Sequence, residues 1–181
     1  MFNLLKKYNA LLEVDMMTPA QRTKSLRGVF DRDIPNNPAF AFREKKIYPI
    51  PAEGMDKVEM LFAHLTTKVT DKETQHREYD RTRSIRIHWI RHHIEERKTD
   101  DMLVFSTVNG REKRTYIYDK AERYVIVLEP KQIKKIKKMN EKQEEYVYKY
   151  YYFLTAYKLE GKDEKRNKIE RLYQRRHNTL L

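Results

Sequence analysis

The sequence predicts an α+β protein, with N-terminal helices followed by an antiparallel β-meander of about four strands and a C-terminal helix. Apolar residues recur at helical spacing as far as residue 97 and alternate from Leu103 onward, which indicates helices first and strands later. A length of 181 residues fits one domain with an N-terminal extension. We therefore expect residues 1–54 to form a helical and extended arm, and residues 55–181 to form the main domain.

The arm is expected to consist of short helices interrupted by prolines. Leucines and a tyrosine at steps of three and four predict a first helix over residues 2–14. Thr18 before Pro19 is typical of a helix start, because the Thr hydroxyl caps the first turn and Pro needs no amide hydrogen there. We expect that second helix to stop at Gly28. Four prolines between residues 35 and 51 then predict an extended linker.

Two further helices are expected in the first part of the main domain. Met55 to Val69 places its apolar residues on one stripe, and residues 80–97 place Ile87, Ile90 and Ile94 on another. His88 and His92 lie on the adjoining face of the second of these helices.

The remainder of the chain predicts the meander. Asn109-Gly110 is a strong hairpin signal between two alternating segments, because both residue types tolerate positive φ. The expected elements are strands over residues 103–108, 114–119, 124–129 and 150–159, a lysine-rich interruption at 131–149, and a basic helix over 162–177.

The composition points to a polyanionic partner. Lys and Arg number 39 against 27 Asp and Glu, and this excess, spread along the chain, is the electrostatic pattern of nucleic-acid binding, although an acidic protein partner would also fit. The absence of Cys excludes a disulfide framework, a thiolate zinc site and a Cys nucleophile. No apolar run approaches the roughly 18 residues needed to cross a bilayer, so we expect no membrane association. Because no signal peptide is visible, we expect a cytoplasmic location.

His88 and His92 are the first candidates for chemistry. They are four residues apart on an expected helix, so both rings could face one ligand. A zinc site would need a third ligand, for which Glu95 and Glu96 are nearest, but Trp89 stands where a metalloprotease helix has Glu. We predict no metal and no other cofactor. Packed or solvated histidines, and acid–base chemistry without a metal, both remain open.

A second set of candidates lies on the expected strands. RNA cleavage by the 2′-OH needs a base, an acid and cations that stabilise the phosphorane, and requires no metal. Arg114 and Tyr116 share one face of a strand with Tyr118, and Thr155 and Tyr157 share a face of the last strand. The same alternation is also typical of an ordinary half-buried strand. The basic residues that we expect to contact phosphate by position and charge are Arg111, Lys113, Lys134 and Lys135.

Three stretches together resemble a known superfamily. They are Arg114-Thr115-Tyr116-Ile117-Tyr118-Asp119, Tyr124-Val125-Ile126-Val127-Leu128-Glu129 and Tyr151-Tyr152-Phe153-Leu154-Thr155-Ala156-Tyr157. With the upstream Arg86-Ile87-His88-Trp89-Ile90 segment, residues 80–175 resemble phage and polymorphic-toxin nucleases of the barnase/EndoU/colicin/RelE-like superfamily. The Leu-Thr-Ala-Tyr ending is the most specific part, and the insertion at 131–149 departs from the family pattern.

The resemblance implies a metal-independent endoribonuclease whose sheet face binds RNA. It implies that His88 acts as base or acid, that Arg114 holds the scissile phosphate, and that Thr155 donates a hydrogen bond to a phosphate oxygen or a base. Tyr116 and Tyr157 would stack on nucleobases.

We therefore expect a phage- or mobile-element-borne endoribonuclease toxin that acts in a bacterium or a phage-infected host and is neutralised by an acidic antitoxin or immunity protein. The alternative is a non-catalytic nucleic-acid-binding or phage structural protein that has kept the fold. A zinc hydrolase is the third possibility.

Overall fold

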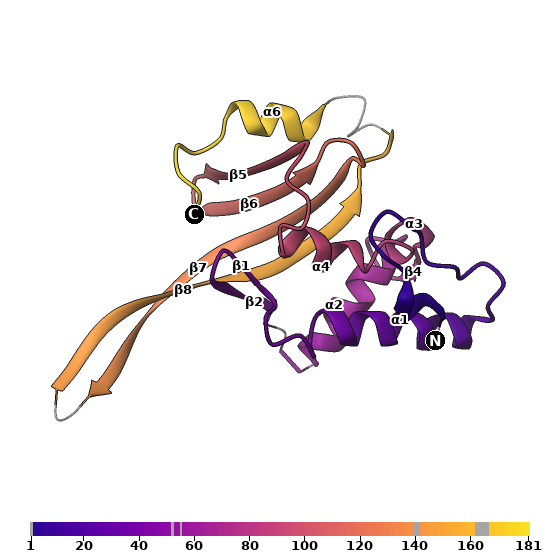
Figure 1. Cartoon of the computed structure of the whole chain (residues 1–181), viewed down its shortest axis with the longest axis horizontal. Coiled ribbons are helices and arrows are strands. Elements are labelled where there is room, and N and C mark those ends of the chain that lie inside the picture. The colour runs from indigo at the N-terminus through magenta and orange to yellow at the C-terminus, as the bar shows by residue number, and fades with distance from the viewer. Residues whose placement is uncertain (1, 52, 55, 140–141, 162–166) are drawn as a thin grey trace.

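A computed structural model describes residues 2–51, 53–54, 56–139, 142–161 and 167–181 (Figure 1). The helices are a 3-10 turn at Phe2–Leu5, α1 (Pro19–Asp33), α2 (Lys57–Thr66), α3 (Arg81–Ser84), α4 (Trp89–Ile94) and α6 (Lys168–Gln174). The strands are β1 (Ala41–Phe42), β2 (Lys45–Pro49), β3 (Thr67–Val69), β4 (Arg77–Tyr79), β5 (Met102–Asn109), β6 (Glu112–Asp119), β7 (Tyr124–Met139) and β8 (Lys142–Lys158).

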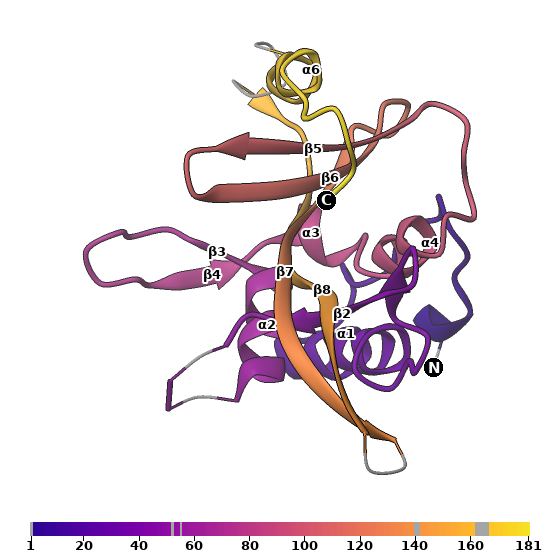
Figure 2. The ribbon, with the colours of Figure 1, turned by 90° about the vertical axis from the view of Figure 1, so that its left-hand side faces the viewer.

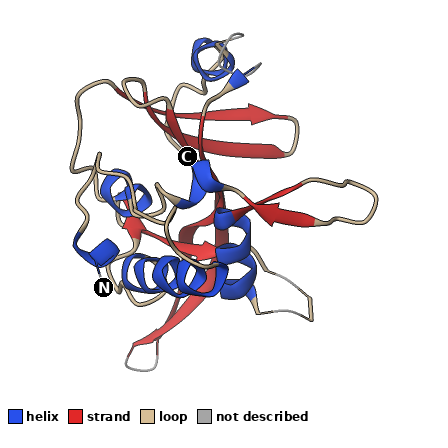
Figure 3. Ribbon diagram, turned by 90° about the vertical axis from the view of Figure 1, so that its right-hand side faces the viewer, coloured by secondary structure: helices blue, strands red, loops and turns tan. Residues whose placement is uncertain are grey.

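The main sheet is mixed and six-stranded, with the order β1-β2-β8-β7-β6-β5. The prediction of an α+β fold is confirmed, but the predicted four-strand antiparallel meander is wrong as a description of the sheet. Strands β5 to β8 do pair antiparallel in sequence, yet β2 adds to β8 in parallel through Ile47 and Tyr151. Strands β3 and β4 form a separate hairpin that stands away from the main sheet (Figure 3).

The two faces of the sheet are covered differently, as Figure 2 shows. Helices α1 to α4 pack on one face and form the larger core with apolar residues of β6, β7 and β8. Helix α6 covers part of the other face, where its Ile169 is buried beside Phe105 and Val127. The larger core also contains Leu12 and Phe30, so it crosses the boundary expected at residue 54.

The N-terminal segment differs most from its prediction. Residues 2–14 form only one 3-10 turn, in which Leu5 is 80% exposed and Asn3 is buried. The amide of Asn3 donates to the backbone carbonyl of Glu13 and accepts from its N–H, which holds the segment as a loop. By contrast, the N-cap of α1 forms at Thr18 as expected, within a capping box that Gln21 completes, and the helix continues past Gly28 to Asp33.

Two segments form strands where the sequence predicts a linker or an interruption. Strands β1 and β2 lie in the segment expected to be a linker, and residues 131–139 and 142–149 prolong β7 and β8 instead of separating them. The expected helix over residues 80–97 is broken between α3 and α4, because the intervening turn buries both Ile85 and Ile87. The expected start of the C-terminal helix at residue 162 lies outside the described residues.

Candidate functional site

The sequence-predicted residues fall on both sides of the sheet. Tyr116 on β6 lies opposite Val127 on β7, which lies opposite Thr155 on β8, so Tyr116 and Thr155 share one face. Tyr116 stacks on Phe105 with ring centroids 5.0 Å apart, beneath α6, and Tyr157 packs in the same small cluster. These residues therefore lie in a row that α6 partly covers.

Arg114 extends this row beyond the end of α6. Its guanidinium lies 3.2 Å from the Glu129 carboxylate, which also pairs with Lys131 at 3.0 Å. Arg111 and Lys113 are exposed at the β5–β6 hairpin. Lys134 and Lys135 are consecutive on β7, so they point to opposite faces.

His88 lies apart from this row, in the helical layer on the opposite face. Its Nε2 lies 3.0 Å from the carbonyl oxygen of Ala10 and 3.3 Å from that of Lys7, and only 5% of the residue is exposed. Burial lowers the pKa of the His88 ring, so it is neutral and donates to these carbonyls. Trp89 Nε1 also donates to the Ala10 carbonyl, and both contacts hold the loop that carries Tyr8.

This loop closes one side of a cleft of about 520 Å³. The cleft lies between the N-terminal segment, the end of α1 and helix α4. Its lining residues are Lys6, Lys7, Tyr8, Arg32, Asp33, His88, Arg91, His92 and Arg97.

The histidines of this region differ in how their ring nitrogens are used. Nε2 of His88 contacts the two backbone carbonyls described above, and its Nδ1 is buried without a hydrogen-bond partner among the described residues. His93 directs Nδ1 at the Trp89 carbonyl at 2.7 Å and Nε2 at an Asp119 carboxylate oxygen at 3.0 Å. Neither ring nitrogen of His92 has a hydrogen-bond partner among the described residues. Within the described part of the chain, His92 therefore differs from His88 and His93 in being partly exposed and in having both ring nitrogens unpartnered, so that a ligand can reach them.

Tyr8 fixes the orientation of His92. The two rings are stacked, with centroids 3.9 Å apart and planes 6° apart. Burial lowers the pKa of His92 to about 4, and the neighbouring His93, Arg97 and Lys98 act in the same direction. The imidazole is consequently neutral at pH 7, and it can accept a proton.

Behind Tyr8, a buried carboxylate organises the wall of the cleft. Asp119 accepts hydrogen bonds from the Tyr8 hydroxyl at 2.6 Å, from His93 at 3.0 Å and from Lys98 at 2.8 Å. Burial alone would raise the pKa of Asp119, but these donors and the backbone N–H of Glu122 lower it to about 2. Burial and the contact with Asp119 raise the pKa of Tyr8, which keeps its hydroxyl protonated.

The cleft walls carry more positive than negative charge. Asp33 pairs with Arg32 and Arg91, and Glu95 pairs with Arg91 and Arg97. Lys7 is exposed and has no carboxylate partner among the described residues. The arrangement therefore favours an anionic ligand next to His92.

The side chains considered for a metal have other partners. His88 contacts backbone carbonyls, Glu95 contacts Arg91 and Glu96 contacts Arg43. Within the described part of the chain, no group of three or more His, Asp or Glu side chains is placed to hold a metal ion.

Several of these residues were missed from the sequence. The sequence predicts Tyr8 on a helix, and it predicts Asp119 only as the last residue of a strand. A carboxylate directly after the apolar Tyr116–Tyr118 end of the strand is the available signal for Asp119, whereas nothing local connects Tyr8 with His92, 84 positions later.

Fold and site together define a basic α+β protein with a cationic cleft around a neutral histidine. Comparison with protein-family models, with curated proteins and with solved structures found no match for the chain. None of the helices in the described residues is both long and apolar enough to cross a membrane.

Proposed function

We propose that this protein is a metal-independent endoribonuclease with its active site in the cleft around His92. The observation that carries the proposal is the neutral His92 ring, stacked on Tyr8 with both nitrogens open, in a cleft lined by Lys and Arg. A proton acceptor beside cations is the combination that phosphodiester transfer to a 2′ oxygen requires.

In the proposed reaction, His92 removes the proton from the 2′-OH of the substrate. The 2′ oxygen forms a bond to phosphorus, the bond between phosphorus and the 5′ oxygen breaks, and the leaving oxygen takes up a proton from solvent water, to which His92 then returns the proton that it removed. The products are a 2′,3′-cyclic phosphate and a 5′-hydroxyl end. Lys7 and Arg97, both exposed at the cleft, would stabilise the negative charge that develops on the phosphorane.

His88 acts as a positioning residue in this scheme. It binds the carbonyls of Lys7 and Ala10, on either side of Tyr8, and Tyr8 in turn orients His92. We therefore expect His88→Ala to lower the rate by displacing the loop, although the His88 ring does not itself transfer a proton.

The resemblance to the barnase/EndoU/colicin/RelE-like nucleases supports the same activity, with a different location for the base. As a part of the proposal, the protein acts on RNA in the cytoplasm of a bacterium or a phage-infected cell. An acidic antitoxin or immunity protein would fit the net charge of +12.

The test is to incubate the purified chain with total RNA in EDTA and to measure discrete fragments. His92→Gln is expected to lower the rate by about 10²-fold or more, because it removes the base. His76→Gln is the matched control, because His76 is exposed on the β3–β4 hairpin, away from the cleft. Fragments should carry cyclic phosphate ends.

Two outcomes would contradict the proposal. Cleavage by His92→Gln at the wild-type rate would remove His92 from the reaction, and loss of cleavage in Arg114→Gln instead would move the site to the sheet row. Intact RNA that shifts in mobility with the wild type would favour the alternative, a non-catalytic nucleic-acid-binding protein.

A further inference from the structure

Strands β7 and β8 continue as a two-stranded ribbon beyond the rest of the sheet (Figure 1). The pairing of β6 with β7 ends at Leu128, and that of β2 with β8 begins at Tyr151. The ribbon, defined as residues 131–139 and 142–150, therefore projects with both of its edges open. At about 3.3 Å per residue, its strands are about 30 Å long.

A row of tyrosines runs along one face of the ribbon and onto the adjoining part of the main sheet. Tyr146, Tyr148, Tyr150 and Tyr152 alternate along β8, and Tyr48 on β2 joins them. The ring centroids of Tyr148 and Tyr150 are 5.8 Å apart, and those of Tyr48 and Tyr150 are 5.6 Å apart. The Tyr48 and Tyr148 hydroxyls lie 3.0 Å apart. Tyr146 is 44% exposed and Tyr48 40%, so the row offers aromatic surface to solvent.

Lysines of β7 lie on the same face. Lys131 is opposite Tyr150 and Lys135 is opposite Tyr146 in the register. Lys135 lies over the Tyr148 ring at 3.9 Å, and Lys131 lies 5.7 Å from the centre of the Tyr152 ring. Lys134, by contrast, is on the other face and pairs with Glu145 at 3.2 Å. The described ribbon side chains include lysines 131, 134, 135, 137 and 149 and glutamates 144 and 145.

We propose that this tyrosine–lysine face of the ribbon binds single-stranded RNA, with bases stacked on the exposed rings and phosphates next to Lys131 and Lys135. The proposal rests on the proposed function in taking RNA as the ligand. It specifies that the RNA is single-stranded and that it binds to a surface separate from the cleft.

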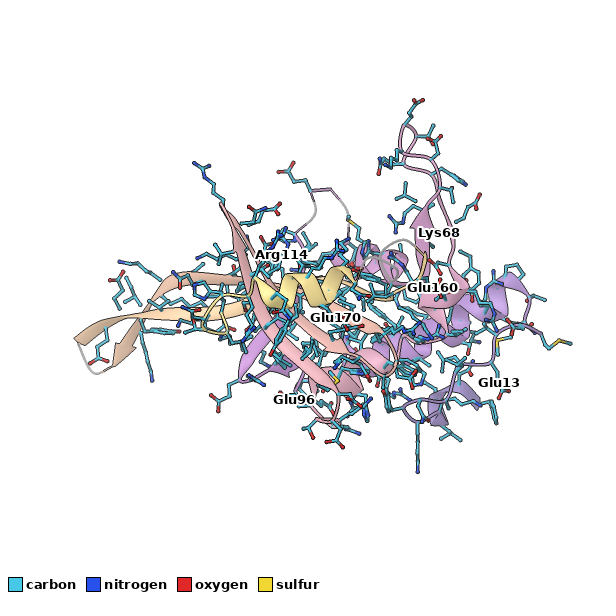
Figure 4. All side chains as sticks on the ribbon, turned by 90° about the horizontal axis from the view of Figure 1, so that it is seen from above. Glu13, Lys68, Glu96, Arg114, Glu160 and Glu170 are labelled. Carbon is cyan, nitrogen blue, oxygen red and sulfur yellow. The ribbon has the colours of Figure 1, made fainter. Side chains whose placement is uncertain are left out.

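The chemistry of the face favours single strands. Stacking on aromatic side chains needs an accessible base plane, which a duplex hides, and it tolerates any base. Lysines between the rings supply the sequence-independent attraction to phosphate. The face is also adjacent to Arg114, because Lys131 and Arg114 both pair with the Glu129 carboxylate. Figure 4 shows Arg114 close to α6, with the ribbon extending away to the left.

The test measures fluorescence anisotropy with a labelled 12-nucleotide 2′-O-methyl oligouridylate. This probe cannot be cleaved through its 2′ oxygen, so binding is measured whether or not the protein is a nuclease. Tyr146→Ala is expected to raise Kd about tenfold, and Tyr146→Phe should keep wild-type affinity because the ring remains. Lys135→Gln should reduce the slope of log Kd against log salt by about 0.7.

Lys149→Gln is the control that removes one charge from the opposite face of the ribbon. It should weaken binding less than Lys135→Gln does. The proposal is overturned if Tyr146→Ala binds as the wild type does, or if a duplex of the same length binds as tightly as the single strand. If the wild type is a dimer, and Tyr146→Ala is a monomer with unchanged Kd for the probe, the ribbon joins two copies of the protein instead of binding RNA.

The two proposals fail in different ways. Loss of probe binding in Tyr146→Ala together with absent RNA cleavage by the wild type would support the ribbon site and reject the nuclease. Cleavage that depends on His92, with unchanged probe binding in Tyr146→Ala, would support the nuclease and reject the ribbon site. If both hold, Tyr146→Ala should raise KM for a long RNA and leave kcat unchanged.

Discussion

Replacing Asp119 by Asn is expected to lower the free energy of unfolding by about 3–5 kcal/mol at pH 7, as for other buried charges that lose their pairing. The carboxylate is completely buried and accepts from Tyr8, His93 and Lys98. An Asn side chain has one acceptor oxygen and presents an NH₂ group to donors. At least one of these three groups would lose its acceptor inside the protein.

Part of this magnitude follows from the carboxyl pKa. A pKa that falls on folding from its ordinary 3.8 to about 2 contributes about 2.4 kcal/mol at neutral pH. Because the folded-state pKa is the lower one, this contribution is complete above about pH 4 and disappears as the pH falls towards 2. The difference in stability between wild type and Asp119→Asn should therefore shrink over that range.

Urea unfolding monitored by Trp89 fluorescence measures both effects, since Trp89 is the single tryptophan and is 2% exposed. Asp100→Asn, at an exposed position, is the matched control and should leave the unfolding midpoint unchanged. A loss below about 1 kcal/mol at pH 7 would refute the reasoning, because a fully paired buried carboxylate cannot be removed so easily. A larger loss that stays constant down to pH 2 would refute the linkage part.

Three further predictions concern other residues. Burial lowers the pKa of His64 to about 4, so the wild type should lose up to about 2 kcal/mol of unfolding free energy as the pH falls from 6.5 to 4.5. His64→Leu should remove this loss. Equal pH dependence of the unfolding free energy in urea titrations of both proteins would contradict the prediction. Gly110→Ala should cost about 1 kcal/mol in thermal unfolding, since Gly110 has φ of +57° and Ala is strained there; an unchanged Tm would contradict it. For RNA cleavage, kcat/KM should stay level from pH 7 to about 5 and fall tenfold per pH unit below about 4, where His92 becomes protonated; a fall centred near pH 6.5 would assign the base elsewhere.

Local sequence signals predict the elements that are specified mainly by contacts between residues close in sequence. The Thr18 cap, the β5–β6 hairpin and the inward positions of the C-terminal helix all follow from periodicity and turn chemistry. The hairpin differs in one detail. Its two-residue loop is Gly110-Arg111, with Asn109 paired to Glu112, because only Gly110 has positive φ in the turn.

The rest depends on contacts that no local pattern contains. Strand β2 has few apolar residues, and it is a strand because its backbone pairs with the edge of β8. Residues 2–14 have helical spacing, yet the Asn3 amide satisfies the Glu13 backbone and Leu12 enters the core. The cleft arises from that loop meeting α4, so His92 was visible in the sequence whereas its partner Tyr8 was not.

The parallel pairing of β2 with β8 also determines how long β2 waits for its partner strand during synthesis. Ile47 pairs with Tyr151, roughly 100 residues later, and at about 5–20 residues per second the ribosome needs roughly 5–20 s to supply that partner. Until then Phe42 and Ile47, both buried in the finished protein, have no sheet to join. Because closing a long loop costs chain entropy before the pairing forms, we expect the β2–β8 pairing to form late in the assembly of the sheet.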